Sequence, residues 1–260
     1  MKLAAFMALI SLLFAASSVS AKSAKSSKSS KSSKNRRTLR DEPTQGFIFR
    51  RSISLHKGDK PPAGKISGNT WDLGGLTIDG RDSGDCCDKE GGSKVTIHWK
   101  GLTIRNGRFA NWPDGVGIAA QDVTFENVAF ENCEDCLNTS KGARNWTIRG
   151  CFFRAAPLKT SRQNGYPGDK GLQANVSDGT NLIEGCTFSG FRNAIRAGSQ
   201  KYRKSAGSIV IRNNRFLNSA TAIHAVAGDI VVNPDSNFYL KVPQPHRTES
   251  PGRLILSPTR

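Results

Sequence analysis

The sequence predicts an all-β fold, a right-handed parallel β-helix, in which the chain winds through stacked coils. Three observations support this fold. A similar unit recurs along the chain, its apolar residues alternate with a period of two, and a Gly or Asn interrupts each unit at a corresponding point. The units cover residues 95–107, 123–133, 146–156, 182–191 and 209–219.

The Gly and Asn interruptions set the spacing of the coils. Taken as equivalent, they are separated by 26, 23, 35 and 28 residues, at Gly101, Asn127, Gly150, Gly185 and Asn213. Such periods are typical of solenoids, in which each repeat stacks on its neighbours and builds a continuous apolar inner column. Gly and Asn tolerate the positive φ that a tight corner needs. A β-sandwich is the alternative fold, but the hairpin turns that it requires are sparse.

The sequence near each end of the chain predicts segments that lie outside the β-helix. Residues 1–21 combine a basic start, an apolar stretch and small residues, which is the pattern of a secretory signal peptide. Residues 22–45 are rich in Ser and Lys and predict a disordered leader. We expect the β-helix to span residues 46–242, followed by a polar tail over 243–260. The predicted location is therefore secreted and extracellular.

The cysteines form an even set of six, at Cys86, Cys87, Cys133, Cys136, Cys151 and Cys186. In an oxidising secretory route such a set favours disulfides, with the connectivity left open. Cys133 and Cys136 have a CxxC spacing, but no second pair of ligands stands nearby to complete a zinc site. Three sequons predict N-glycosylation, at Asn138, Asn145 and Asn175.

The charge is strongly basic, with 38 Lys and Arg against 21 Asp and Glu and a formal net charge of +17. This balance favours a polyanionic partner, and charge alone does not choose between nucleic acid, anionic membrane and acidic polysaccharide. The few aromatic residues fall at core positions rather than on stacking platforms. No stretch after the predicted signal peptide could span a bilayer. We expect an acidic polysaccharide as the partner, no nucleic acid, no membrane, and a monomer.

A group of charged residues falls at corresponding points of neighbouring units. Asp114, the pair Glu134-Asp135, the pair Asp169-Lys170 and Arg196 lie 20 to 35 residues apart from one group to the next. One coil of a β-helix advances only about 4.8 Å along the axis, so these side chains can become neighbours. Converging carboxylates supply the oxygen ligands that Ca²⁺ prefers, and the cations would lie at the rim of the site.

This constellation suits β-elimination on a uronate polymer. Removing the proton on C5 requires that the charge of the adjacent carboxylate be neutralised, which Ca²⁺ or Arg can do. It also requires a base within hydrogen-bond reach. A lysine is a poor base at neutral pH because its ordinary pKa lies near ~10.4, so we expect an alkaline optimum. The alternative is that these charges only form salt bridges between coils.

The same residues resemble the class III pectate lyases, polysaccharide lyase family 3, over roughly residues 95 to 200. The family's Asp-Gly is followed after 20 residues by Glu-Asp-Ala-x-Thr, and here Asp114-Gly115 is followed by Glu134-Asp135-Cys136-Leu-Asn-Thr139. The family's Asp-Lys-x-x-Gln is similar to Asp169-Lys170-Gly-Leu-Gln173, and its Phe-Gly-Lys-x-x-Arg to Phe191-Arg192-Asn193-Ala-Ile-Arg196. The resemblance implies a right-handed β-helix that cleaves pectate in a Ca²⁺-dependent way.

The resemblance also implies roles for individual residues. Lys170 and Arg196 would be catalytic, and Ca²⁺ would be held by Asp114, Glu134 and Asp135, with Asp169 beside them. The family's second lysine is Asn193 here, so Arg192 becomes a third catalytic candidate, although alternation along a strand would point it to the other side. The expected substrate-binding residues are Gln173, Asn193, Arg162 and Lys201.

Two functions therefore follow from the sequence. The first is a secreted pectate lyase that cleaves polygalacturonate by Ca²⁺-dependent β-elimination. The second is a non-catalytic or weakly catalytic β-helix protein that binds acidic cell-wall or matrix polysaccharide. Asn193 in place of a lysine and the basic leader favour the second function.

Overall fold

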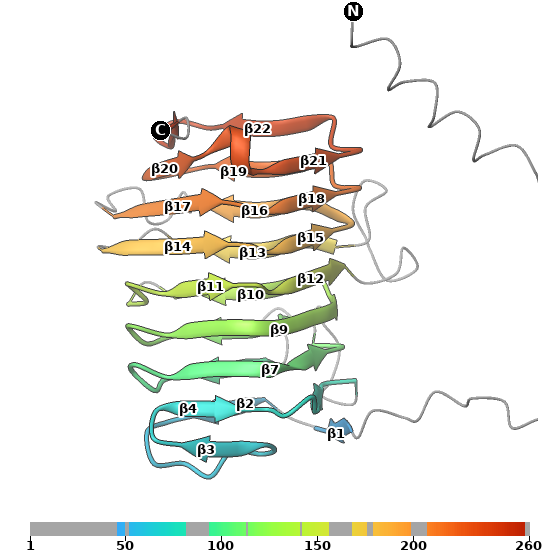
Figure 1. Cartoon of the computed structure of the whole chain (residues 1–260), viewed down its shortest axis with the longest axis vertical. Coiled ribbons are helices and arrows are strands. Elements are labelled where there is room, and N and C mark those ends of the chain that lie inside the picture. The colour runs from blue at the N-terminus through green and yellow to red at the C-terminus, as the bar shows by residue number, and fades with distance from the viewer. Residues whose placement is uncertain are drawn as a thin grey trace, which may run out of the picture. The chain divides into compact units, whose positions relative to one another are not determined.

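A computed structural model shows a parallel β-helix, which confirms the predicted fold class (Figure 1). The structure describes residues 46–49, 52–81, 94–112, 114–140, 142–155, 168–175, 179–198 and 207–257. All of these lie in one compact unit, 43–260. The predicted signal peptide, the Ser/Lys leader, Cys86, Cys87, Arg162 and Lys201 lie outside the described residues, and secretion stays a prediction.

Each full coil contributes three strands, which stack on the strands of the next coil in register. The first stack runs through β4 (Thr70–Asp72), β7 (Thr103–Ala110), β9 (Thr124–Cys133), β11 (Thr147–Arg149), β14 (Thr180–Glu184), β17 (Ser208–Arg212), β20 (Asp229–Val232) and β23 (Arg253–Leu256). The second runs through β1 (Gly46–Ile48), β5 (Thr77–Asp79), the later parts of β7 and β9, β12 (Phe152–Ala155), β15 (Thr187–Ser189), β18 (Arg215–Leu217) and β21 (Phe238–Leu240).

The third stack is a separate sheet of eight parallel strands, which carries the candidate site. It runs through β2 (Ile53–Leu55), β6 (Val95–Ile97), β8 (Val116–Ile118), β10 (Asp135–Thr139), β13 (Gly168–Ala174), β16 (Phe191–Ala197), β19 (Thr221–Ala225) and β22 (Gln244–Thr248). β3 (Lys65–Ser67) pairs antiparallel with β4 at the start of the helix. Among the described residues the single helical turn is η3 (Pro234–Ser236), and none of the helices is long and apolar enough to cross a membrane.

The corner between the first two stacks explains the Gly and Asn pattern. Asn127, Gly150, Gly185 and Asn213 occupy this corner in successive coils, with φ between 53° and 65°. The first member, however, is Asn106 and not Gly101. The register pairs Arg105 with Glu126 and Gly107 with Val128, which places Asn106 beside Asn127, 21 residues away. Gly101 belongs to the preceding corner, which also has positive φ, and this similarity explains the error.

The predicted inner column is a ladder of stacked aromatic rings. Consecutive ring centroids lie 4.5 to 5.8 Å apart along Phe109, Phe130, Phe153, Phe188, Phe216 and Tyr239. All of the Phe rings in this ladder are fully buried. Because a buried Phe excludes a large apolar area from water, this ladder contributes much of the stability of the β-helix.

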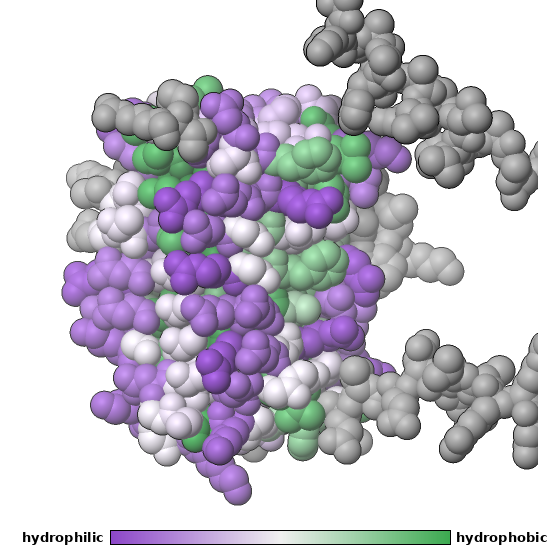
Figure 2. Space-filling model, viewed as in Figure 1, coloured by the Kyte–Doolittle hydropathy of each residue, from purple (hydrophilic) through white to green (hydrophobic). Residues whose placement is uncertain are grey.

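The outer face of the first stack carries charges that alternate in sign from one coil to the next. The residues in this register column are Asp72, Arg105, Glu126, Arg149, Glu184 and Arg212. Glu184 contacts Arg149 at 3.2 Å and Arg212 at 2.7 Å. The face of the unit seen in Figure 2 is mostly hydrophilic, with hydrophobic patches among the hydrophilic residues. These charges largely neutralise one another, so this column is a poor surface for a polyanion.

We expect Glu184→Gln to lower the free energy of unfolding by about 1 kcal/mol, because exposed ion pairs contribute about 0.2–1 kcal/mol each and Glu184 makes two. Urea unfolding measures this loss, which should shrink in high salt because the pairs are partly exposed. Glu126→Gln, which removes a contact of 3.7 Å to Arg149, is the matched control and should cost less. Equal losses of stability in the two variants at all salt concentrations would contradict a stabilising role for the two ion pairs of Glu184.

The C-terminal boundary of the β-helix differs from the prediction. β22 pairs with β19 and β23 pairs with β20, so parallel strands continue through Leu256, whereas the sequence placed a tail after residue 242. The side chains of β22 are mostly exposed, and the strand therefore lacks the apolar alternation that reveals the others. Its backbone pairing with a neighbouring coil makes it a strand, and an edge strand tolerates Pro245.

The expected disulfides are absent from the part of the chain that the structure describes. Cys133, Cys136, Cys151 and Cys186 are buried free thiols. Cys133 and Cys186 donate to backbone carbonyl oxygens two residues earlier, at 3.3 and 3.4 Å. Burial raises the pKa of Cys136 and of Cys151, which keeps these thiols protonated. The described thiols thus act as small core residues.

Candidate functional site

The candidate site lies on the outer face of β10, β13 and β16. The register places Lys170 beside both Asp135 and Asn193, although these residues are 35 and 23 positions away in sequence. Three residues further along the same strands, Gln173 lies beside Asn138 and Arg196. Stacking of coils, and no local turn, therefore brings these side chains together.

Lys170 is the centre of an acid–base cluster formed by Asp135, Asp169, Lys170 and Arg192. Its Nζ lies 2.7 Å from Asp135 Oδ2 and 2.7 Å from Asp169 Oδ2. Arg192 approaches Asp169 Oδ1 at 3.8 Å. The side chain of Lys170 is 15% exposed and that of Asp135 is 19% exposed, so the cluster is largely but not fully withdrawn from water.

The local field shifts the pKa values of the two central groups. Burial lowers the pKa of Lys170, but the charges of Asp135 and Asp169 outweigh burial and the net shift is upward. Burial raises the pKa of Asp135; the nearby carboxylates of Asp169 and Asp114 add to the rise, and Lys170 opposes it. The Oδ1 atom of Asp135 is buried without a hydrogen-bond partner among the described residues. Lys170 is thus firmly cationic at neutral pH.

Backbone contacts fix the acidic groups next to this lysine. The carbonyl oxygen of Glu134 accepts the N–H groups of Asp169 and Lys170, at 3.0 and 3.1 Å. Asn138 Nδ2 donates to the carbonyl oxygen of Asp114 at 3.1 Å. Gly115, with a φ of 57°, permits the close approach of that turn to β10, because a Cβ there would lie 1.9 Å from the carbonyl oxygen of Cys136. The glycine after Asp114 is therefore a structural requirement of the site.

The carboxylates of the site do not form a ready cage for Ca²⁺. Within the described residues, no three His, Cys, Asp or Glu side chains are grouped so that they could hold a metal ion. The ammonium of Lys170 lies between Asp135 and Asp169, at the point where a shared cation would bind. The carboxylates as arranged therefore do not fit a Ca²⁺ ion, and calcium dependence stays a prediction that a chelator can test.

A second polar group lies beside the cluster and contains Arg196. Its Nη1 donates to Gln173 Oε1 at 3.1 Å, and Gln173 Nε2 donates to the carbonyl oxygen of Gly198 at 2.9 Å. The next coil places His224 in register with Arg196, and the coil after that adds Arg247. Arg196 therefore belongs to a basic column that continues toward the C-terminal end.

His224 was not among the predicted site residues, although the structure places it beside Arg196. Its Nε2 lies 3.0 Å from Glu249 Oε1, yet neither ring nitrogen makes a well-aligned hydrogen bond. Burial lowers the pKa of His224, and Arg247 and Arg196 add to this effect against the pull of Glu249. One sequence signal could have found it, because His224 follows Arg196 by 28 residues, the same interval as between Gly185 and Asn213.

Comparison with known families identifies the fold that carries these strands. A family model described as the right-handed beta helix region matches residues 90–238, more than half of the chain. The chain belongs to this right-handed β-helix family. The matched residues contain β6 to β20 and every candidate residue of the site, from Asp114 to Arg196. None of the curated proteins matches the chain. Family membership thus establishes the fold, which polysaccharide-degrading enzymes share with other proteins.

The side chain of Arg192 does not point to the side that simple alternation along a strand would give. Asp169 and Lys170 are consecutive, and yet both side chains enter the same cluster, as Arg192 does from the next coil. Alternation therefore fails at the start of β13 and β16, where the strands leave a corner. Asn193 is almost buried and lies beside Lys170 in register.

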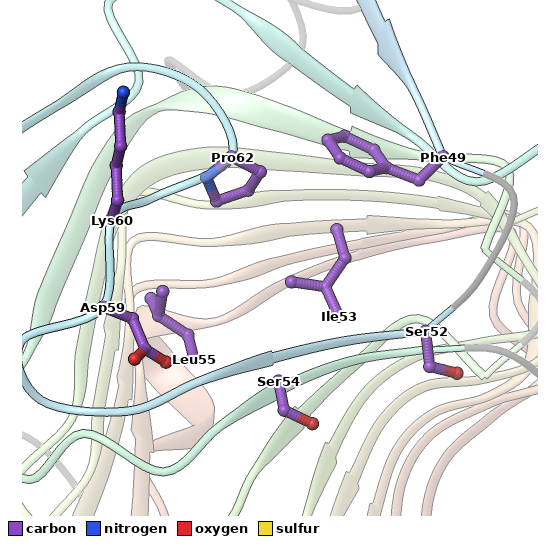
Figure 3. Close-up of a pocket in the computed structure, with 8 residues that line it drawn as sticks. All are labelled: Phe49, Ser52, Ile53, Ser54, Leu55, Asp59, Lys60 and Pro62. Carbon is purple, nitrogen blue, oxygen red and sulfur yellow. The ribbon is translucent and has the colours of Figure 1, made fainter.

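A separate hollow of about 590 Å³ lies at the N-terminal end of the β-helix (Figure 3). Its walls combine apolar side chains such as Phe49, Ile53 and Pro62 with the charged residues Asp59 and Lys60. Residues of β2, the first strand of the third stack, line this hollow. β6 and β8 separate β2 from the acid–base cluster. None of the predicted site residues lines this hollow.

Proposed function

We propose that this protein is a secreted lyase that cleaves polygalacturonate, or a closely related uronate polymer, by β-elimination. The observation that carries the proposal is the pairing of two cationic centres on one outer face. Lys170 forms ion pairs with Asp135 and Asp169. Arg196 lies on the next coil, three residues further along the strand. β-Elimination on a uronate needs a cation at the carboxylate and a base at the neighbouring C5 proton, and these two residues are of the types that can supply them.

The surface around the cluster supports a linear polymer as the substrate. One register column follows the outer face of all eight strands of the third stack. At the usual spacing of about 4.8 Å between strands, this column is about 34 Å long. Its residues are Ser54, Thr96, Gly117, Asn138, Gln173, Arg196, His224 and Arg247. Its side chains change from neutral to basic along the axis. Such a track suits an extended chain whose anionic groups repeat.

In the proposed reaction Arg196 holds the carboxylate of the uronate that is being cleaved. Lys170, in its neutral form, takes the proton from C5; the electron pair forms the C4–C5 double bond, and the C4–O bond breaks. The leaving oxygen then takes a proton from solvent. Because the pKa of Lys170 is raised, its neutral fraction is small at pH 7, and the rate should increase toward alkaline pH.

The test is the ultraviolet absorbance of the unsaturated product, measured from pH 7 to 11 with added Ca²⁺ or a chelator. We expect absorbance to develop faster at alkaline pH in the wild-type chain. Arg196→Ala should slow the reaction by about 100-fold or more, as does the loss of one group that stabilises developing charge. Arg253→Ala, which removes an exposed arginine on a different stack, should leave the rate unchanged. The absence of product from every uronate polymer would contradict the lyase.

A second candidate function is binding of acidic polysaccharide without cleavage. The observation in its favour is that both carboxylates beside Lys170 already bind its ammonium, while Asn193 replaces the second lysine of the lyases it resembles. A cation held in this way can attract a polyanion but is slow to act as a base. Retention of the chain on immobilised polygalacturonate, without any product release at pH 7 to 11, would select this function.

A further inference from the structure

Two histidines lie side by side just after the first two strands of the third stack, and β8 separates these strands from β10 of the acid–base cluster. His56 follows Leu55 of β2, and His98 follows Ile97 of β6, in register. Their rings are 4.5 Å apart between centroids and nearly parallel, with an angle of 3° between the planes. Both residues are exposed, and the N–H of His98 donates to the carbonyl oxygen of Leu55 at 2.9 Å.

A hydrogen-bonded turn follows His56. The N–H of His56 donates to Asp59 Oδ2 at 2.7 Å, and the N–H of Asp59 donates back to the carbonyl oxygen of His56 at 3.1 Å. This turn fixes the direction in which His56 leaves the strand. On the next coil the corresponding position is Ala119, which adds only a methyl group beside His98. On that side His98 therefore has only a small side chain next to it.

The chemistry of the pair is that of a metal chelate. Imidazole nitrogens suit Zn²⁺, Ni²⁺ and Cu²⁺, with bonds near 2.0–2.1 Å. Two nitrogens on a tetrahedral ion lie about 3.3 Å apart. The rings must therefore turn from their parallel stacking until one nitrogen of each points at the ion.

We propose that His56 and His98 bind one divalent transition-metal ion of the Zn²⁺, Ni²⁺ and Cu²⁺ class, with water completing its coordination. The ion links two successive coils through side chains, and it stabilises the pairing of β2 with β6 at the N-terminal end of the β-helix. This site is independent of the acid–base cluster and of the polysaccharide that we propose as substrate.

The experiment is titration of the full chain with Zn²⁺ and with Ni²⁺ in a calorimeter. We expect one equivalent to bind the wild-type chain, and binding to weaken by about 100-fold or more in His56→Ala and in His98→Ala, because each variant loses one of two ligands. His246→Gln is the matched control, since His246 bonds Tyr239 at the other end and should leave metal binding unchanged. A variant with Cys86→Ser and Cys87→Ser excludes thiol ligands from those positions.

Amide hydrogen exchange supplies a readout that simple surface adsorption of metal would not change. In the wild-type chain Zn²⁺ should slow exchange of the His98 N–H, which bonds to β2, and this protection should disappear in His56→Ala. Equal metal binding in the wild-type chain and both alanine variants would overturn the proposal. So would the absence of binding to the wild-type chain, in which case the pair is an aromatic contact only.

Discussion

Replacing Lys170 with methionine should abolish cleavage of polygalacturonate and weaken retention on the polymer. Met keeps much of the length of the side chain but removes the cation that both Asp135 and Asp169 contact at 2.7 Å. Loss of a positioned base typically lowers a rate by about 10²–10⁴-fold. The free energy of unfolding should fall by about 2 kcal/mol, less than the 3–5 kcal/mol for a fully buried pair, because these groups keep some contact with water.

The charge and the basicity of Lys170 can be separated. Lys170→Arg keeps a cation but not a base, because a guanidinium does not lose its proton at accessible pH. If Lys170 is the base, this variant should retain the polymer and release no product. Lys100→Met, which alters an exposed lysine 3.7 Å from Asp122, is the control and should change neither property. Wild-type rates of product release in Lys170→Met would exclude Lys170 from catalysis.

The pH dependence of stability follows from the same ion pairs. The pKa of Lys170 in the folded chain lies above its ordinary value of 10.5, so the folded state binds this proton more tightly than the unfolded state. Its contribution to stability is fully present below pH 10.5 and is lost as the pH rises through the folded value. The stability difference between wild type and Lys170→Met should therefore shrink above pH 10.5, which denaturant titrations at several pH values measure.

Phe153→Ala should destabilise the β-helix more than either Lys170→Met or Glu184→Gln. The ring is fully buried, and its centroid lies 4.8 Å from that of Phe130 and 4.5 Å from that of Phe188. Truncation removes the apolar contacts on both sides and leaves a cavity that neighbouring coils cannot fill without losing their register. We expect a loss of about 4 kcal/mol in the free energy of unfolding, and a fall of about 8–16 °C in Tm.

The adjacent residue provides a matched control for this prediction. Phe152 lies on the same strand but faces outward and is 36% exposed. Phe152→Ala removes the same atoms from the surface, and we expect a loss below about 1 kcal/mol. Denaturant unfolding of both variants measures the contrast. Similar losses in Phe152→Ala and Phe153→Ala would show that the aromatic ladder is not the core of the β-helix.

Much of the fold could be read from the sequence because burial leaves a local pattern. In each unit the alternation of apolar residues marks one side of a strand, and a Gly or Asn marks the corner that follows. These signals predicted the coils around Asn127, Gly150, Gly185 and Asn213. They failed for β22, whose exposed side chains carry no such pattern, and for the first corner, where Gly101 and Asn106 both have positive φ.

The sequence by itself determined that the chain forms stacked coils and that Asp135, Lys170 and Arg196 could share one face. Tertiary structure alone decided which groups meet: Lys170 lies between two carboxylates, Arg192 joins them, and Arg196 stands with Gln173 and His224. It also left the described cysteines as free thiols. The physical reason is that alternation reports burial along one strand, whereas the partner in the next coil depends on loop lengths and on bends at the corners.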